Sequence, residues 1–377
     1  MRRIRVGHIG WLSWDEGPEC ETVAWCDANQ HKLKQSVAEH PQVATYTDYR
    51  DMLRHAGMDA VVISTPNEFH AEQAIAFLDA GVDVFLEKPM GVNKAECDAI
   101  LQAAARSGRT LVIDFELRIS LFCRRVRALI ESGAYGELRR IEFFHHRGCW
   151  LEEGNGCWRV RPEKSGGFYF MEPIHEVDLF RLLGGEVRAV QSTSGSNVLP
   201  QYQFEDNVCS HFFFEGGALG TIVTSHTHSA WADKTSKWGD LGHDMALIVT
   251  LTQGSIGVDF IRQRILVNRF ETYPAGTEGV RVVLDHVEDH AAAGYMEFCH
   301  DIDGMRREFI RRLAEGLQPV QDALGAWRTH RVCLAAEQSL KEDFRRVAVD
   351  YTLPEGCESL SAPAPAAHTL LFGRKSR

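Results

Sequence analysis

The sequence lacks the features that would assign it to several specialised classes of protein. It has no run of about 18 apolar residues, so we expect no membrane-spanning helix. Only a short apolar run follows Met1, Arg2 and Arg3, and we expect no signal peptide. Basic residues are not in excess, because 41 Lys and Arg are set against 52 Asp and Glu. The net charge of −11 argues against non-specific binding to nucleic acid or to an anionic membrane surface.

Paired cysteine motifs are also absent. The ten cysteines are scattered and form no CxxC motif. Together with the missing signal peptide, this pattern predicts a cytoplasmic protein with reduced thiols. Cys149 and Cys157 could form a metal or redox pair, but thiols that pack in the interior are the preferred interpretation.

What remains is an ordinary globular composition. Apolar residues make up 44% and charged residues 25% of the chain. The length of 377 residues suggests two or three domains, and we find no internal repeat.

The first third of the chain alternates between expected strands and expected helices. The expected strands are residues 4–10, 22–26, 42–46, 59–65, 82–86 and 110–115. The expected helices are residues 29–40, 48–56, 70–80, 93–108 and 121–132. This alternation predicts an α/β domain, residues 1–118, with a doubly wound parallel sheet covered by helices on both faces.

Polar residues follow these strands and should gather at one edge of the sheet. Because crossovers are right-handed, the carboxyl ends of parallel strands share an edge, where open α/β sheets bind ligands. Those ends carry Gly10, Asp27, Thr65-Pro66-Asn67, Glu87-Lys88-Pro89 and Glu116. Taken alone, Glu87-Lys88-Pro89 could equally be a surface ion pair that ends a strand.

The pattern changes after Leu138. Short strands joined by glycine turns are expected at residues 140–146, 208–214, 219–226, 245–252 and 255–260. A helix at residues 173–183 and two late helices at 301–313 and 322–342 accompany them. We therefore predict an α+β domain, residues 119–350, with a large open, mainly antiparallel sheet. Residues 351–377 are predicted to form an extended C-terminal tail.

Two blocks at a specific spacing resemble a known family. The segment from Asp59 to His70 (DAVVISTPNEFH) is followed by Ala80-Gly81 and by Val84-Phe85-Leu86-Glu87-Lys88-Pro89. These blocks resemble the Gfo/Idh/MocA family of NAD(P)-dependent oxidoreductases, which act on sugars, inositols and related polyols. The resemblance continues at Arg118, Trp158-Arg159 and His175, and covers roughly residues 4–345.

The resemblance implies a Rossmann domain followed by an open mixed sheet, with NAD (or NADP) as cofactor. Lys88 would contact substrate and nicotinamide, His175 would be the acid/base, and Glu172 would assist it. The family pattern also implies that the peptide bond before Pro89 is often cis. The residues expected to bind the cofactor are Gly10, Trp11, Leu12, Asp27, Ser64, Thr65, Pro66, Asn67, His70, Glu87 and Lys88. Those expected to bind substrate are Arg118, Trp158, Arg159 and Tyr169.

The phosphate-binding loop departs from the family pattern. The fingerprint G-x-G-x-x-G is missing, and bulky residues from Trp11 to Trp14 follow Gly10. Only 11 residues separate Gly10 from Thr22, so we predict a short or absent first crossover helix. Backbone amides of residues 11–14 could replace the missing helix terminus, or cofactor binding could be lost. Asp27 favours NAD over NADP, although His31 and Lys32 leave NADP open.

A second departure lies beside His175. Met171 and Pro173 occupy the positions where the family usually carries an acid and a glycine. We therefore predict that Glu172 supplies the carboxylate from a shifted position. Asp178, one helical turn later, could orient His175 or pair with Arg181.

Three functions remain open on the sequence alone. The first is a dehydrogenase or reductase acting on a sugar, cyclitol or ketosugar. The second uses a tightly bound NAD in transient oxidation that drives elimination or hydrolysis of a glycoside. The third is a sensor of sugar or dinucleotide without catalysis. The open sheet is a face that family members commonly use to form dimers or tetramers, so a homo-oligomer is expected.

No metal is expected. His226 and His228 share one face of a strand and could combine with His175 or His211, but no further ligand close to them is evident.

Overall fold

The computed structural model describes residues 2–10, 18–55, 57–150, 157–227, 243–272 and 279–361. The chain divides into two compact units. Unit 1 comprises residues 1–114, 305–330 and 351–377, and unit 2 comprises residues 115–304 and 331–350. The division at Asp114 lies close to the predicted boundary at residue 118. Unit 1 also includes two later segments that the sequence prediction assigned to the second domain and to the tail.

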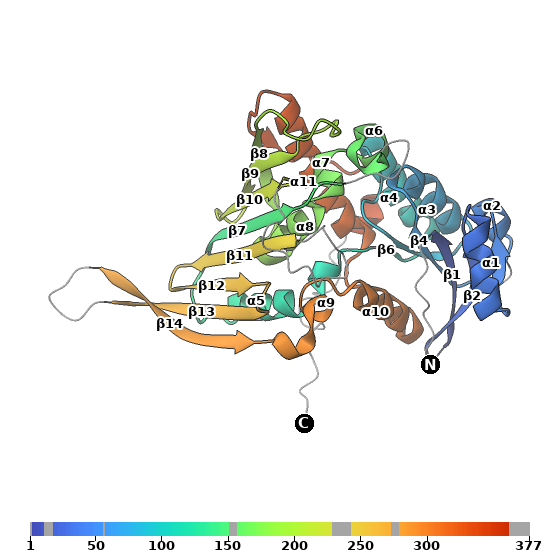
Figure 1. Ribbon diagram of the computed structural model, residues 1–377, viewed down its shortest axis with the longest axis horizontal. Helices are drawn as coiled ribbons and strands as arrows, with labels where there is room; N and C mark the ends of the chain where they lie inside the picture. Colours follow the sequence, from blue (N-terminus) through green and yellow to red (C-terminus); the bar gives the residue numbers. More distant parts are fainter. Residues whose placement is uncertain are drawn as a thin grey trace. The chain divides into compact units, whose positions relative to one another are not determined.

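Unit 1 is built on a six-stranded parallel sheet in the order β3-β2-β1-β4-β5-β6 (Figure 1). Its strands are β1 Ile4–Gly10, β2 Cys20–Cys26, β3 Ala44–Tyr46, β4 Ala60–Ser64, β5 Asp83–Leu86 and β6 Leu111–Ile113. Valine and isoleucine in β4 are buried on both faces, as expected for a central parallel strand. The prediction of a doubly wound parallel sheet is confirmed, and the strand order reverses between β1 and β4.

Local capping signals define the helices of unit 1. These helices are α1 Gln30–Glu39, α2 Tyr49–Met52, α3 His70–Asp79 and α4 Lys94–Ser107. Asn93 caps α4 by accepting a hydrogen bond from the backbone N–H of Glu96, and Gly108 ends the helix in the left-handed conformation. The predicted loss of the first crossover helix concerns residues 11–17, which lie outside the described residues. Strand β2 begins soon after them, at Cys20.

The later segments complete unit 1. Helix α10 (Ile302–Glu315) belongs to it from Met305 onward, and helix α11 (Ala323–Lys341) up to His330. The ring of Phe309 packs against Phe85 of β5, with 5.5 Å between the ring centroids. This contact agrees with the prediction that the late helices pack on the core. Residues after Tyr351 also contact unit 1, since Gln102 donates to the backbone carbonyl of Glu355.

Unit 2 contains a nine-stranded sheet in the order β14-β13-β12-β11-β7-β10-β9-β8-β15. Its strands are β7 Leu138–Arg147, β8 Val187–Ser194, β9 Asn207–Phe214, β10 Leu219–Ser225, β11 His243–Leu251, β12 Gly254–Asp259, β13 Arg264–Thr272, β14 Val280–Asp289 and β15 Val347–Ala348. Neighbouring strands are antiparallel except β7 and β10. The predicted mainly antiparallel sheet is confirmed. Strands β8, β13, β14 and β15 were not predicted.

Side chains alternate between the two faces of this sheet. In β7, Phe143 and His145 are buried, while Phe144 and His146 point to the opposite face. The buried face packs against helix α8 (Ile174–Gly184), where Phe180 meets Phe212 of β9 with 5.6 Å between ring centroids. Helix α5 (Leu121–Glu131) and the short helices α6 Pro162–Ser165, α7 Phe168–Met171 and α9 Tyr295–Phe298 complete unit 2, with 3₁₀ turns at Glu116–Arg118 and Trp158–Val160.

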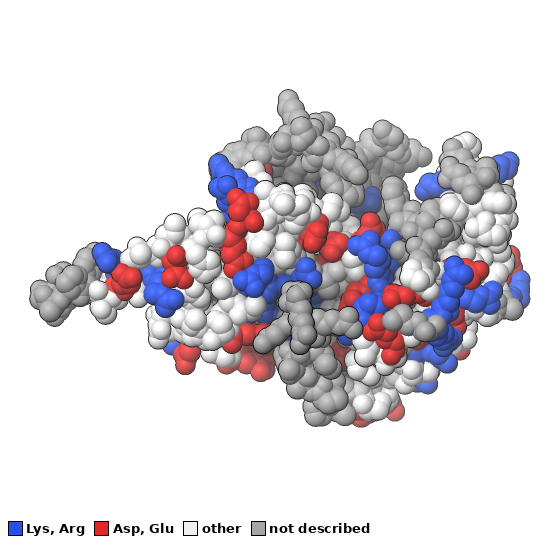
Figure 2. Space-filling model, turned by 90° about the horizontal axis from the view of Figure 1, so that it is seen from below, with Lys and Arg blue, Asp and Glu red and all other residues white. Residues whose placement is uncertain are grey.

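The surface is mixed in charge. On the face shown in Figure 2, acidic and basic side chains of the described residues lie intermixed. Some of them pair across the hairpin of β13 and β14, as Arg281 does with Glu271. Among the helices of the described residues, none is long and apolar enough to cross a membrane.

Candidate active site

The end of β1 approaches the end of β4 too closely for any residue but glycine. Gly10 has a φ of 86°, and a Cβ added there would lie 2.5 Å from the backbone oxygen of Ser64. An L residue at this position would be strained both by its backbone conformation and by this contact. Gly10 therefore keeps a narrow cradle open beside the point where the strand order reverses, which is where open α/β sheets bind ligands.

Asp27 follows β2 at the same edge. One carboxylate oxygen accepts from the backbone N–H of Asn29 at 2.8 Å, and the other lies 3.5 Å from Nζ of Lys32. The first contact is an Asx turn, so Asp27 does help to start helix α1. Its carboxylate also follows the second strand of the sheet, which is the position of the acid that binds the ribose of a dinucleotide in Rossmann domains.

A buried histidine joins the ends of β4 and β5. The ring nitrogens of His70 lie 2.6 Å from the carbonyl oxygen of Pro89 and 2.9 Å from that of Thr65. Burial lowers the pKa of His70, and a neutral ring donates to only one of these oxygens at a time. His70 thus holds the chain after Thr65 and the chain after Lys88 against each other.

The segment after β5 is fixed from its other side as well. The Lys88–Pro89 peptide bond is cis, as the family pattern implied. His330 donates from Nδ1 to the carbonyl of Ala326, and its Nε2 accepts from the backbone N–H of Met90 at 2.7 Å. This arrangement fixes the neutral tautomer of His330 and anchors the chain two residues after Lys88.

The predicted cofactor residues of unit 1 thus follow four neighbouring strands, β2, β1, β4 and β5. The described ones are Gly10, Asp27, Ser64, Thr65, Pro66, Asn67, His70, Glu87 and Lys88. Trp11 and Leu12 lie outside the described residues. The cradle at Gly10 and the carboxylate of Asp27 fit a dinucleotide, so the described part of the chain is suited to hold one.

A buried carboxylate binds two histidines in unit 2. Glu116 is 3% exposed, and its two oxygens lie 3.0 Å from Nδ1 of His175 and 2.9 Å from Nδ1 of His300. Burial alone would raise the pKa of Glu116, but the two histidines hold that pKa well below its usual range. Glu116 therefore stays ionised. It is hydrogen-bonded to Nδ1 of His300 and lies within ion-pair distance of Nδ1 of His175.

His175 lies in the first turn of helix α8, with its ring edge-on to Phe115 at 6.0 Å between centroids. Its Nδ1 faces Glu116, which leaves Nε2 as the nitrogen that can accept a proton. A histidine backed by a carboxylate in this way is the usual construction of a general base.

In the structure, the carboxylate that faces Nδ1 of His175 is that of Glu116, whereas the sequence prediction expected Glu172 there. Glu172 follows the short helix α7 and is bound by Nη1 of Arg147 at 2.8 and 3.0 Å and by the indole N–H of Trp150 at 2.8 Å. These contacts hold Glu172 in a separate buried ion pair. Glu172 therefore does not supply the carboxylate that the family usually places at position 171.

Asp178 binds a residue that the sequence prediction did not consider. Its carboxylate binds the guanidinium of Arg118, with 2.9 Å between Nη2 and Oδ1, while Arg181 binds Glu186. Arg118, predicted to contact substrate, is thus neutralised within unit 2.

Two of the predicted substrate residues lie together beside the Arg147–Glu172 pair. The guanidinium of Arg159 stacks on the rings of Trp158 at 4.5 Å and of Trp150 at 4.8 Å. The fourth, Tyr169, is fully buried, and its hydroxyl is bonded to those of Ser192 and Ser210. We therefore leave Tyr169 out of the proposed substrate site.

Of the histidine pair considered as metal ligands, His226 lies within the described residues. Nδ1 of His226 is bonded to the hydroxyl of Tyr202 at 2.7 Å, and burial lowers the pKa of His226 to about 4. His228 lies outside the described residues. Within the described ranges, no three His, Cys, Asp or Glu side chains are grouped closely enough to hold a metal ion. The ten cysteines are all described, and no two are joined by a disulfide.

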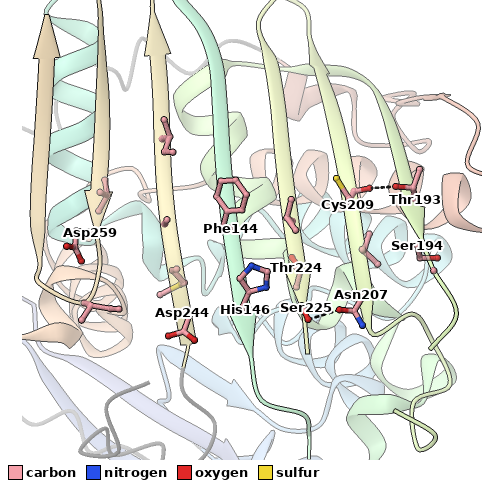
Figure 3. Close-up of a pocket in the computed structure, with 18 of the residues that line it drawn as sticks. Phe144, His146, Thr193, Ser194, Asn207, Cys209, Thr224, Ser225, Asp244 and Asp259 are labelled. Atoms are coloured by element: carbon pink, nitrogen blue, oxygen red, sulfur yellow. Dashed lines mark hydrogen bonds between the residues drawn. The ribbon is translucent and has the colours of Figure 1, made fainter. Parts of the chain in front are cut away.

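A wide groove lies on the other face of the nine-stranded sheet (Figure 3). It has a volume of about 1240 Å³ and is lined by residues of β7 to β12, including Phe144, His146, Asn207 and Ile248. None of the predicted site residues lines it. The groove and the Glu116 cluster therefore belong to opposite faces of the sheet, since His145 on the helix side contacts Glu176 of α8.

Sequence reasoning missed the roles of Glu116 and His300. Glu116 was noted only as a polar residue at a strand end, and no motif singled out His300. Their pairing brings together residues that are distant in the chain, so no local spacing could predict it.

Comparison with known proteins identifies the class. One family model, described as an oxidoreductase family with an NAD-binding Rossmann fold, matches residues 6–115. A second, the GFO/IDH/MocA C-terminal domain, matches residues 123–257. The chain belongs to the Gfo/Idh/MocA family, and unit 1 contains its NAD-binding domain.

Relatives of known name are distant. A 1-carboxy-3-chloro-3,4-dihydroxycyclohexa-1,5-diene dehydrogenase of Comamonas testosteroni is 31% identical over 46% of this chain and 44% of its own length. An inositol 2-dehydrogenase of Salmonella typhimurium is 27% identical over 44% of this chain and 47% of its own. The chain thus spans about half the length of these curated relatives. A solved levoglucosan dehydrogenase in complex with NADH and L-sorbose shares the fold, with a TM-score of 0.75 at 19% identity over 93% of this chain and 100% of that one.

Proposed function

We propose that this protein oxidises a CH–OH group of a sugar or cyclitol with NAD, or reduces the corresponding carbonyl with NADH. The observation that carries the proposal is His175 at the start of helix α8 with the buried carboxylate of Glu116 behind it. A hydroxyl that loses hydride must also lose a proton, and this pair supplies the base.

The proposed reaction assigns a separate task to each residue. Nε2 of His175 takes the hydroxyl proton, and Glu116 stabilises the imidazolium that results. The family resemblance assigns Lys88, in unit 1, to contact with substrate and nicotinamide, and its ammonium would stabilise negative charge that develops on a substrate oxygen. Bound NAD supplies the acceptor for the hydride. In the reverse direction His175 returns the proton.

The cofactor would be held by Gly10, Asp27, residues 64–67 and Glu87. His70, which is buried with both ring nitrogens on backbone carbonyls, would fix the strand ends around it. The carboxylate of Asp27 would bind the ribose hydroxyls and repel a 2′-phosphate, which favours NAD over NADP. The neighbouring Lys32 weakens this preference without reversing it, because it is already 3.5 Å from Asp27.

Trp158 and Arg159 are the proposed substrate contacts. Indole rings pack well against the apolar faces of a sugar or cyclitol ring, and a guanidinium donates to its hydroxyls. Relatives named for inositol and levoglucosan support a polyhydroxylated ring as the substrate class.

The test is an absorbance assay of NADH formation with a panel of polyols and sugars. Steady NADH formation with one class of compound supports the proposal. Product that appears without net NADH indicates transient oxidation, and calorimetry that detects no binding of NAD(H) or NADP(H) contradicts both reactions.

Two variants test the residue assignment. Lys88→Ala and His175→Ala should each reduce kcat by about 10²- to 10⁴-fold, because each removes a group that acts on the reacting oxygen. Lys94→Ala and His286→Ala are matched controls at exposed positions and should keep wild-type rates. Circular dichroism and Tm establish that all four variants are folded. Unchanged rates in both test variants would overturn the assignment.

A further inference from the structure

We propose that His300 shares the Glu116 carboxylate with His175 and thereby sets the strength of His175 as a base. This inference rests on the proposed function, in which His175 is the base. It assigns a positioning role to His300, a residue outside the sequence blocks that carry the family resemblance. All three residues belong to unit 2.

The geometry divides one carboxylate between two rings. Oε1 of Glu116 faces Nδ1 of His300 at 2.9 Å, and Oε2 faces Nδ1 of His175 at 3.0 Å. Nδ1 of His300 is hydrogen-bonded to Glu116, and Nδ1 of His175 faces Glu116 at ion-pair distance, so the carboxylate favours a proton on Nδ1 of either ring. Both rings face the same carboxylate. Protonation of one ring therefore adds a positive charge beside Glu116 and weakens the net attraction of the carboxylate for a proton on the other ring.

The two rings differ in access to solvent. The side chain of Glu116 is 4% exposed, that of His175 is 14% exposed and that of His300 is 23% exposed. His300 is thus the more accessible of the two histidines. When His300 gains a proton, its charge offsets the carboxylate, and His175 holds its own proton less strongly. When His300 is neutral, the full charge of Glu116 acts on His175.

The other titratable groups around the cluster do not replace this coupling. Glu176 lies beside His175, but it is 2.9 Å from Nδ1 of His145, and that histidine opposes the effect of burial and lowers the pKa of Glu176. Beside His300, burial raises the pKa of Cys299 and of Tyr295, so both stay neutral. Asp244 acts on Tyr295 from β11. Glu116 is therefore the charge that the two histidines share.

Two variants should act in opposite directions. His300→Gln keeps an amide that can donate to Glu116 but removes the competing charge. The acidic limb of the kcat/KM profile should then move up by roughly one pH unit, because His175 is protonated more easily. Glu116→Gln removes the carboxylate, so the limb should move down by a similar amount and kcat should fall by about 10- to 100-fold.

The second readout does not need catalysis. Nitrogen NMR of the histidine rings, in protein without cofactor, reports the tautomer of His175 and the midpoint of its titration. The midpoint should rise in His300→Gln and fall in Glu116→Gln, and exposed His286→Gln should leave it in place. If Glu116→Gln does not fold, His300→Gln still decides the direction.

The two readouts separate the two proposals. If the midpoint of His175 moves in opposite directions in His300→Gln and Glu116→Gln while no polyol is turned over, the shared carboxylate is supported and the proposed function is contradicted. A midpoint of His175 that does not move in His300→Gln, or that moves down, overturns the role of His300 even if the enzyme is active.

Discussion

The buried carboxylates of unit 2 differ in what faces them. Glu116 faces two histidines, and Glu172 faces Arg147 and Trp150. Glu337 of α11 instead accepts from the backbone N–H of Tyr169 at 2.7 Å, and burial raises its pKa to about 7. Lys341 opposes this rise and Glu205 adds to it. Glu337 is therefore a carboxyl that stays protonated in the folded protein until the pH approaches about 7.

The raised pKa of Glu337 should make the fold less stable as pH rises. Its ordinary value is 4.5, so between pH 4.5 and about 7 the folded state binds more protons than the unfolded state. The free energy of unfolding should fall through this window and level off above it. Glu337→Gln keeps the acceptor for Tyr169 but cannot ionise. The variant should be more stable than wild type by roughly 3 kcal/mol above pH 7, with no difference below pH 4.5.

Urea unfolding at pH 5, 6, 7 and 8 measures this effect. Glu355→Gln, at an exposed position, is the control and should follow the wild-type curve. A Glu337→Gln variant whose advantage does not grow with pH would show that Glu337 is ionised in the folded protein.

At the scale of elements, two glycines distinguish the effect of the close contact between β1 and β4 from the effect of backbone conformation alone. Gly10 and Gly108 both have positive φ, 86° and 65°. A Cβ on Gly10 would lie 2.5 Å from the oxygen of Ser64, whereas a Cβ on Gly108 would meet no atom within 4 Å. Gly108→Ala should cost only the backbone strain, about 1 kcal/mol. Gly10→Ala should cost more and also displace the strand ends that are proposed to hold the cofactor.

Calorimetric titration with NADH distinguishes the two variants. Gly10→Ala should weaken binding by about tenfold or more, equivalent to about 1.4 kcal/mol. Gly108→Ala, at the end of α4, should bind as wild type does. Equal affinities for both variants would mean that the cradle at Gly10 does not hold the cofactor.

The elements that could be predicted are those with a local sequence signal, either a run of buried apolar residues or a capping pair. Strand β4 is an unbroken run of apolar residues, and Asn93 with Glu96 marks the start of α4. Strands β13 and β14 could not be predicted in the same way. All the side chains of β14 are exposed or partly exposed, so the strand is stabilised by pairing with β13 and carries no pattern of burial.

The residues of the candidate site also differ in whether local sequence could predict them. Motif residues at strand ends, such as Lys88, and the histidine at a helix start could be predicted because spacing along the chain places them. The partner of His175 could not, because Glu116 reaches it from another element. Glu172 illustrates the difference: it is next in sequence to the expected position, yet its side chain binds Arg147.

At the scale of the whole molecule, the nine-stranded sheet leaves a broad apolar surface. Seven exposed large apolar residues lie on or beside β11 to β14: Ile248, Ile261, Leu266, Val280, Val282, Leu284 and Val287. Beside them runs the groove over β7 to β12 (Figure 3), and β13 with β14 forms a long hairpin at the edge of the sheet (Figure 1). Exposed apolar surface of this extent usually marks an interface.

We propose that a second copy of the chain covers this face. Stable dimers bury about 800 Å² on each partner, and a sheet face several strands wide offers that area. Light scattering after gel filtration should give two or four times the chain mass of 42.4 kDa.

Ile248→Glu combined with Leu266→Glu places charge on the face and should yield monomers, because an unpaired carboxylate in an apolar interface is costly to desolvate. Leu317→Glu, at an exposed apolar residue of unit 1, is the matched control and should keep the oligomer. A wild-type monomer, or an oligomer that survives the double substitution and dissociates in the control, would place the interface elsewhere, and the sheet face would then need another occupant.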